Sequence, residues 1–110
     1  MKLIQSTTLL AAFSTILLSS PLACLAADGA TLYMTKTCVA CHGKDAKTPL
    51  LPEYPKLAGQ NAAYALQQMK DIKSGARNNA QTASMKGVMH LVTEEEMAAL
   101  ADYLQSLPAQ

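Results

Sequence analysis

The sequence contains few of the residues that usually hold a small domain together. Its 110 residues include three cysteines, two histidines, one phenylalanine and no tryptophan. It shows no strand pattern, no internal repeat and no glycine-rich loop of the kind that cradles phosphate. This length allows one domain, and the absences argue against β-rich, repeat and phosphate-loop architectures.

The first part of the chain has the order of a secretory signal peptide. Lys2 supplies a positive charge, residues 9–18 form an apolar run, and residues 23–27 are mostly small. The apolar run is too short to span a bilayer comfortably, which takes roughly 20 residues. The pattern therefore predicts export, with a retained N-terminal anchor as the alternative.

The predicted signal peptide covers residues 1–26, with cleavage after Ala26 or Ala27, and Cys24 is discarded with it. The remaining domain, residues 27–110, is expected to be periplasmic, without stable membrane insertion and without a nucleic-acid partner. A domain this small buries only roughly 60% of the surface that its unfolded chain exposes. Small exported domains are commonly stabilised by disulfides, a metal or a cofactor.

Only Cys38 and Cys41 remain for such a role, in the segment Cys-Val-Ala-Cys-His that ends at His42. A CxxC pair has three common interpretations: a redox dithiol, half of a zinc site, or a haem attachment site. The dithiol interpretation requires a βαβ surround, which the sequence does not show. A zinc site requires further ligands, but the remaining domain has no other cysteine, and His90 is its only other histidine. The adjacent His42 favours covalent haem c, one per chain, with His42 as an iron ligand.

The sequence around this motif resembles the class I cytochromes c, and among them the cytochrome c4 and c553 type. Residues 41–45 resemble the family's CHGxD run, residues 52–60 resemble its phrase around PKLAGQ, and residues 85–88 resemble its MxGI phrase. Ala46 stands where the family often has glycine, and Ser84 precedes Met85 where a methionine doublet is common. Cytochromes c4 carry two haem domains in tandem, so this chain resembles a single half.

The expected fold is all-α: three main helices and loops wrapped around one covalent haem. The helices are predicted over residues 29–36, 61–77 and 93–107, with Asn61 and Thr93 as N-caps, Glu96 completing a capping box, and Gly75 ending the middle helix. Residues 43–60 and 76–92 are expected to be loops. Tyr33 and Met69 are interpreted as packing residues. The resemblance implies that the last helix crosses the first, with Tyr103 at the family's aromatic position.

Three side chains are candidates for the second axial position on the iron: Met85, Met89 and His90. In similar sequences the ligand methionine lies about eight residues before the Ser or Thr that opens the last helix, which implies Met85, with Met89 as the runner-up. His90 is expected to be an ordinary surface or core-edge histidine. The resemblance also implies that the carbonyl of Pro52 accepts a hydrogen bond from the outer nitrogen of His42, which would fix its tautomer.

Methionine and histidine together fill both axial positions and raise the reduction potential. This ligand set predicts a periplasmic single-electron carrier and not an enzyme. Its expected redox partners are a membrane cytochrome complex, a terminal oxidase or reductase, or a flavoprotein dehydrogenase. The alternative is a haem-bearing electron-acceptor subunit of a periplasmic dehydrogenase such as flavocytochrome c sulfide dehydrogenase. A ligand-binding sensor with an open iron position would require that Met85 is not a ligand.

Charge is unevenly distributed along the predicted domain. Residues 36–86 contain all of its basic side chains, whereas residues 87–110 contain four acidic side chains and no basic one. Charge fields steer encounters between proteins more than they set affinity. The distribution favours an acidic docking patch on the redox partner.

Overall fold

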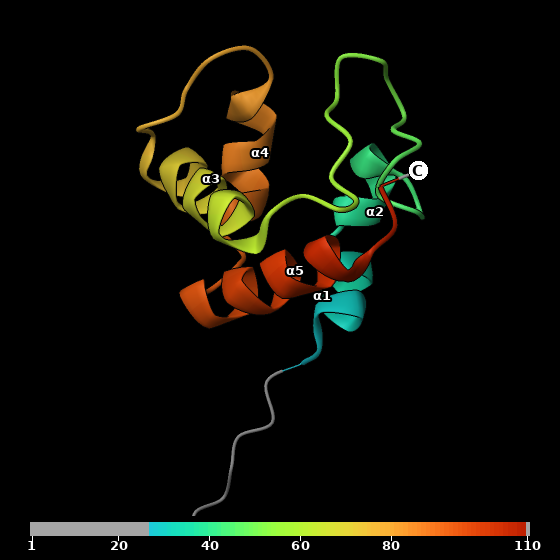
Figure 1. Cartoon of the computed structure of the whole chain (residues 1–110). Helices are drawn as coiled ribbons and strands as arrows, with labels where there is room; N and C mark the ends of the chain where they lie inside the picture. The colour runs from blue at the N-terminus through green and yellow to red at the C-terminus, as the bar shows by residue number, and fades with distance from the viewer. Residues whose placement is uncertain (1–26, 110) are drawn as a thin grey trace, which may run out of the picture.

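The protein is described by a computed structural model for residues 27–109, and these residues are helical without strands. The helices are α1 (Gly29–Thr35), α2 (Cys38–His42), α3 (Ala62–Ser74), α4 (Thr82–Met89) and α5 (Glu94–Ser106). In Figure 1, α3 and α4 lie above α5 on the left, α1 crosses the right-hand part of α5, and α2 and the loop 43–60 lie above α1. The expectation of an all-α fold is confirmed. The predicted signal peptide, residues 1–26, lies outside the described residues.

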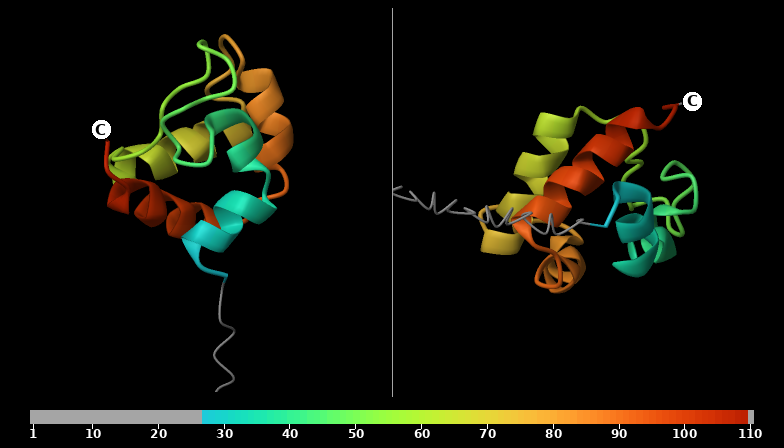
Figure 2. Two further views of the ribbon diagram at one scale, coloured as in Figure 1. Left: turned by 90° about the vertical axis from the view of Figure 1, so that its right-hand side faces the viewer. Right: turned by 90° about the horizontal axis from the view of Figure 1, so that it is seen from below.

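α1 and α5, the first and last helices of the described chain, cross one another (Figure 2). Gly29 lies at the point of closest approach, where an added Cβ would overlap the carbonyl oxygen of Ala99 and the Cβ of Tyr103. Farther along α1, the Tyr33 ring packs against the Tyr103 ring with 5.7 Å between their centroids. The expected crossing of first and last helices, with Tyr103 as its aromatic member, is therefore present.

Side-chain caps define the predicted helix starts. The Asn61 side chain accepts a hydrogen bond of 3.0 Å from the backbone N–H of Tyr64. Thr93 and Glu96 form the complete capping box at α5. Gly75, at φ 88°, ends α3 in the left-handed region. α3 thus ends at the glycine that was predicted to end it, short of residue 77, to which the family resemblance extends the helix.

Residues 76–92 were predicted as a loop, and this prediction was wrong because they contain α4. Gln81 precedes α4 without a side-chain cap bond, and Gly87 lies inside the helix, so local sequence signals for it are weak. Packing against α3 supplies its stability instead: Met89 and Thr82 are buried. α2 is a second helix that the sequence did not predict, since its five residues coincide with the haem-attachment motif.

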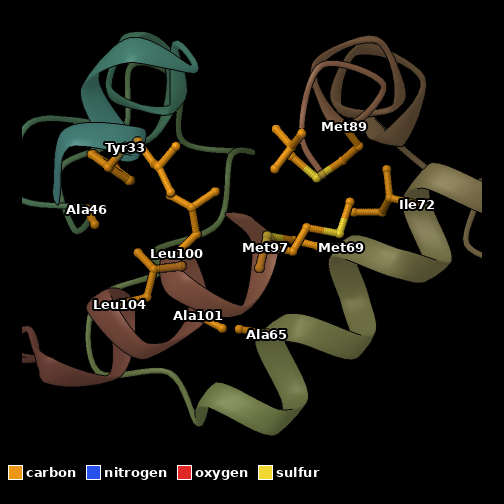
Figure 3. Close-up of a cluster of buried hydrophobic side chains, with 12 residues drawn as sticks. Tyr33, Ala46, Ala65, Met69, Ile72, Met89, Met97, Leu100, Ala101 and Leu104 are labelled. Atoms are coloured by element: carbon orange, nitrogen blue, oxygen red, sulfur yellow. The ribbon is translucent and has the colours of Figure 1, made fainter. Parts of the chain in front are cut away.

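The core lies above α5, between the two sides of the molecule. Figure 3 shows Met69, Met89 and Met97 pointing toward one another where α3, α4 and α5 meet. Tyr33 and Leu32 of α1 are buried at the other end of the same cluster. Met69 and Tyr33 are therefore packing residues, as expected. None of the helices among residues 27–109 has the length and apolarity to cross a membrane.

The loop 43–60 is ordered by hydrogen bonds from its own residues. The Asp45 carboxylate accepts hydrogen bonds from the backbone N–H groups of Lys47 and Thr48 and from the Thr48 hydroxyl, and these bonds lower the pKa of Asp45. Ala46 is fully buried, and its carbonyl accepts hydrogen bonds from the N–H groups of Leu57 and Ala58. Ala46 has a φ of 57°, a left-handed conformation that favours glycine. This conformation explains why glycine is frequent here in the family that the sequence resembles.

The α1–α5 crossing leads to a prediction about Gly29. Gly29→Ala should destabilise the protein by about 1–3 kcal/mol or more, because the new methyl group overlaps the backbone of α5. The matched control is Gly87→Ala in α4, where an added Cβ meets nothing within 4 Å. The control should be neutral or stabilising by about 0.5–1 kcal/mol, since alanine restricts the unfolded chain. Denaturant unfolding of both variants measures this difference, and equal stabilities would contradict the close crossing.

Candidate functional site

α2 places three chemically reactive side chains on one short helical turn. Thr37 before it and Gly43 after it both have positive φ, 65° and 85°, so the chain turns sharply at each end. A side chain at position 43 would overlap the backbone of Thr48. The turn keeps α2 short and directs Cys38, Cys41 and His42 to the wall of one cavity.

His42 is 3% exposed, and its two ring nitrogens have different surroundings. Nδ1 lies 2.9 Å from the carbonyl oxygen of Pro55. A carbonyl oxygen only accepts hydrogen bonds, so Nδ1 carries the proton in the neutral ring and Nε2 has a free lone pair. Nε2 is buried without a hydrogen-bond partner. Burial lowers the pKa of His42, while the Pro55 carbonyl partly opposes this by favouring a protonated ring.

The contact with Pro55 corrects the prediction for Pro52. Pro52 is exposed, and the carbonyl that holds His42 comes from three residues later in the same loop. The bonds of Leu57 and Ala58 to Ala46 bring this later part of the loop back against the end of α2. A backbone carbonyl exists at every residue, so the sequence carried no signal that distinguished Pro55 from Pro52.

A second hydrogen bond that the sequence analysis missed stabilises the end of α2. The hydroxyl of Tyr33 donates to the carbonyl oxygen of Gly43, at 2.7 Å. Tyr33 is 1% exposed, and burial raises the pKa of its hydroxyl well above its usual range. Gly43, the residue next to His42, is therefore hydrogen-bonded to a side chain that packs in the α1–α5 crossing.

The two thiols are half-buried and unpaired, and both line the cavity. Burial raises the pKa of the Cys38 thiol. Backbone bonding also holds Cys41 in place, because its carbonyl accepts a hydrogen bond of 2.9 Å from the N–H of Leu50. The described residues contain no group of three or more His, Cys, Asp or Glu side chains that could hold a metal ion.

The cavity has a volume of about 440 Å³, within the range of roughly 300–1,000 Å³ for small-molecule sites. The α2 side carries Cys38, Cys41 and His42, and the α4 side carries Met85 and Met89. α3 and α5 close it with apolar side chains, namely Ala65, Met69, Ile72, Leu100 and Leu104. His90, at the end of α4, is exposed and is not among the lining residues.

These residues fit a covalently bound haem c. An unpaired, buried imidazole nitrogen is a costly feature unless something binds it, and a haem iron is such a ligand partner. The two thiols lie on the same short helix and can each form a thioether with the macrocycle. The apolar lining matches the flat faces of a haem.

Comparisons with known proteins agree with this fit. The family model described as cytochrome c matches residues 26–108. The thiosulfate dehydrogenase electron acceptor of Stutzerimonas stutzeri is 36% identical, over 76% of this chain and 41% of that protein. Cytochrome c-553 of Nitratidesulfovibrio vulgaris is 35% identical, over 77% of this chain and 81% of that protein.

A solved structure also resembles the chain. Reduced recombinant cytochrome c4 from Pseudomonas stutzeri superposes with a TM-score of 0.63 at 32% sequence identity, over 73% of this chain. The match covers 46% of the cytochrome c4 chain. The chain thus spans less than half the length of this structure and of the thiosulfate dehydrogenase electron acceptor.

The two thiols give a prediction about attachment. Mass spectrometry of the acid-denatured protein should show one haem retained per chain, because thioether bonds survive denaturation. Cys38→Ser or Cys41→Ser should leave a single thioether and lower the yield of folded, haem-containing protein, since cofactor binding contributes to folding stability. A wild-type chain mass without a haem adduct would contradict the assignment of this site.

Proposed function

Because this chain belongs to the cytochrome c family, whose members carry electrons on covalently bound haem c, we propose that it is a periplasmic single-electron carrier. His42 and Met85 are the proposed axial ligands of its one haem. The observation that supports this most directly is the buried, unpartnered Nε2 of His42 at the wall of a cavity whose α4 side carries Met85. The proposed periplasmic location rests on the signal peptide predicted from sequence.

The residues of this chain prepare His42 for its role. The Pro55 carbonyl holds the proton on Nδ1, so that Nε2 presents its lone pair, and the same bond increases the basicity of the ring. Burial of His42 keeps competing water away from Nε2. When bound, the haem supplies an iron whose oxidation state changes by one as it accepts or donates a single electron. The thioether of Met85 and the apolar lining favour the less charged ferrous state and raise the reduction potential.

Met85 and Met89 are four residues apart in α4, so both lie on the same face of the helix. Both line the cavity, but their burial differs. Met89 is 1% exposed and lies among Met69 and Ile72 in the core, as Figure 3 shows. Met85 is only half-buried and packs at the edge of this core. The proposal assigns packing to Met89 and iron ligation to Met85.

A second candidate is an electron-acceptor subunit bound to a periplasmic dehydrogenase, for example a flavocytochrome c sulfide dehydrogenase. The observation that favours an acceptor role is the 36% identity to a thiosulfate dehydrogenase electron acceptor. Isolation from the native host distinguishes the two candidates. A free shuttle should elute alone, and a subunit should co-purify with a larger, flavin-containing protein.

The charge asymmetry along the sequence is partly cancelled in the fold. Lys36 of the α1 C-terminus pairs with Glu96 at 3.1 Å, and Lys70 of α3 pairs with Glu94 at 3.1 Å. The acidic first turn of α5 is thus beside basic side chains rather than at a separate negative pole. Lys44 and Lys86 form no salt bridge with the described residues and are exposed. These two lysines are the better candidates for steering an acidic partner.

The axial assignment predicts opposite behaviour for two methionine variants. Met85→Ala should abolish the weak sulfur-to-ferric-iron charge-transfer band and lower the reduction potential. Met89→Ala should keep the band and nearly the same potential, but destabilise the protein by about 2–5 kcal/mol through a core cavity. Absorption spectra, potentiometry and denaturant unfolding measure these effects. Loss of the band in Met89→Ala, with retention in Met85→Ala, would transfer the ligand assignment to Met89.

The steering proposal predicts a dependence on salt. The second-order rate of electron transfer with the physiological partner should fall by about tenfold from low to high ionic strength. Lys44→Gln and Lys86→Gln should each weaken this dependence. Lys70→Gln is the matched control, because Lys70 is already paired with Glu94. A flat salt profile in the wild type would favour an uncharged contact instead.

A further inference from the structure

The hydroxyl of Tyr33 connects α1 to the end of α2. The side chain is 1% exposed, and its Oη donates a hydrogen bond of 2.7 Å to the carbonyl oxygen of Gly43. Tyr33 also lines the haem cavity, so this bond lies beside the cofactor site. Burial raises the pKa of the hydroxyl well above its usual range, so the group stays protonated and remains a donor at neutral pH.

Gly43 is the residue at which α2 ends, and hydrogen bonds from both sides hold it. Its φ of 85° favours glycine, and its N–H donates to the carbonyl of Val39 at 3.1 Å. Its carbonyl also accepts a hydrogen bond of 3.2 Å from the N–H of Ala46. These bonds tie Gly43 to α2 and to the loop 43–60, whereas the Tyr33 hydroxyl ties it to a different helix. Because Gly43 follows His42 directly, the bond from Tyr33 fixes the backbone from which the imidazole extends.

The His42 ring itself is held at one nitrogen. Nδ1 is hydrogen-bonded to the Pro55 carbonyl at 2.9 Å, and Nε2 has no partner among the described residues. The direction of Nε2 therefore depends on two supports: the Pro55 carbonyl at the ring and the Gly43 peptide at the backbone. Because the imidazole is a rigid plane, a displacement of either support must turn the ring or lengthen the Nδ1 hydrogen bond.

We propose that Tyr33 is a positioning residue for His42, and that its hydroxyl acts through the Gly43 peptide. The Tyr33 ring packs against Tyr103 in the crossing of α1 and α5, so the hydroxyl couples the orientation of the iron ligand to that crossing. This role rests on the proposed haem site, but it does not depend on whether Met85 or Met89 is the second ligand. It belongs to the hydroxyl and not to the packing of the ring.

Phenylalanine at position 33 separates the hydroxyl from the ring. Tyr33→Phe keeps the aromatic contact with Tyr103 and leaves the Gly43 carbonyl with its other donor, the N–H of Ala46. No carbonyl is left without a partner, so the variant should fold and attach haem as the wild type does. If the hydroxyl only stabilised the fold, its removal would lower the free energy of unfolding and leave the orientation of the imidazole unchanged.

The test is proton NMR of the haem-loaded, oxidised protein, in which the shifts of the haem methyl groups report the orientation of the axial imidazole plane. Tyr33→Phe should move methyl groups on adjacent pyrroles in opposite senses, as a rotation of this plane requires. It should also raise the hydrogen-exchange rate of the His42 Nδ1–H by about three- to tenfold, as expected when one hydrogen bond that supports the closed state is lost.

Tyr103→Phe is the matched control, because it removes a hydroxyl from the same pair of rings while the bond to Gly43 stays. It should leave both measurements as in the wild type. Covalent haem and the axial charge-transfer band should persist in Tyr33→Phe, which separates this proposal from failure of the haem site or of the ligand assignment. Unchanged methyl shifts in Tyr33→Phe, or equal changes in Tyr103→Phe, would overturn the role of the Tyr33 hydroxyl. A change confined to one methyl group would also overturn it, since that would show only a direct contact of the ring with the haem.

Discussion

The hydrogen bond between the His42 ring and the Pro55 carbonyl is the contact on which the site depends. It fixes which nitrogen carries the proton, and so leaves Nε2 buried with a free lone pair. The path of the loop 43–60 makes this bond possible. Hydrogen bonds from the N–H groups of Leu57 and Ala58 to the Ala46 carbonyl bring the second half of the loop back to α2. A chain that buries an unsatisfied nitrogen in this way is incomplete without a ligand for it.

The architecture explains how so short a chain supports such a site. α5 contacts both α1 and α3, and α4 packs on α3, so the cavity lies between two sides that share α5 as their base. Small domains bury a limited fraction of their surface, and here a large part of the potential core is cavity. A haem adds apolar area on both of its faces, so the cofactor that performs the function also completes the packing.

Much of this was predictable from the sequence because it depends on local chemistry. Asn61, Thr93 and Gly75 mark helix ends through their own side chains or backbone freedom, and the CxxCH motif joins thiols and imidazole within five residues. α4 was not predictable in this way, since its helix is stabilised by Met89 in the core and not by a cap. The identity of Pro55 as the partner of His42 was equally hidden, because it depends on the path of a whole loop.

The close approach at Gly29 has a consequence for the order of events during folding. The long-range partner of α1 is α5, which follows every other described helix along the chain. Contacts between such distant parts of the chain form slowly, since the whole intervening loop must close first. The core is therefore incomplete until α5 has packed against α1 and α3. Until α5 packs, the cavity lacks Leu100 and Leu104, so the binding site for the cofactor is completed only by this late contact.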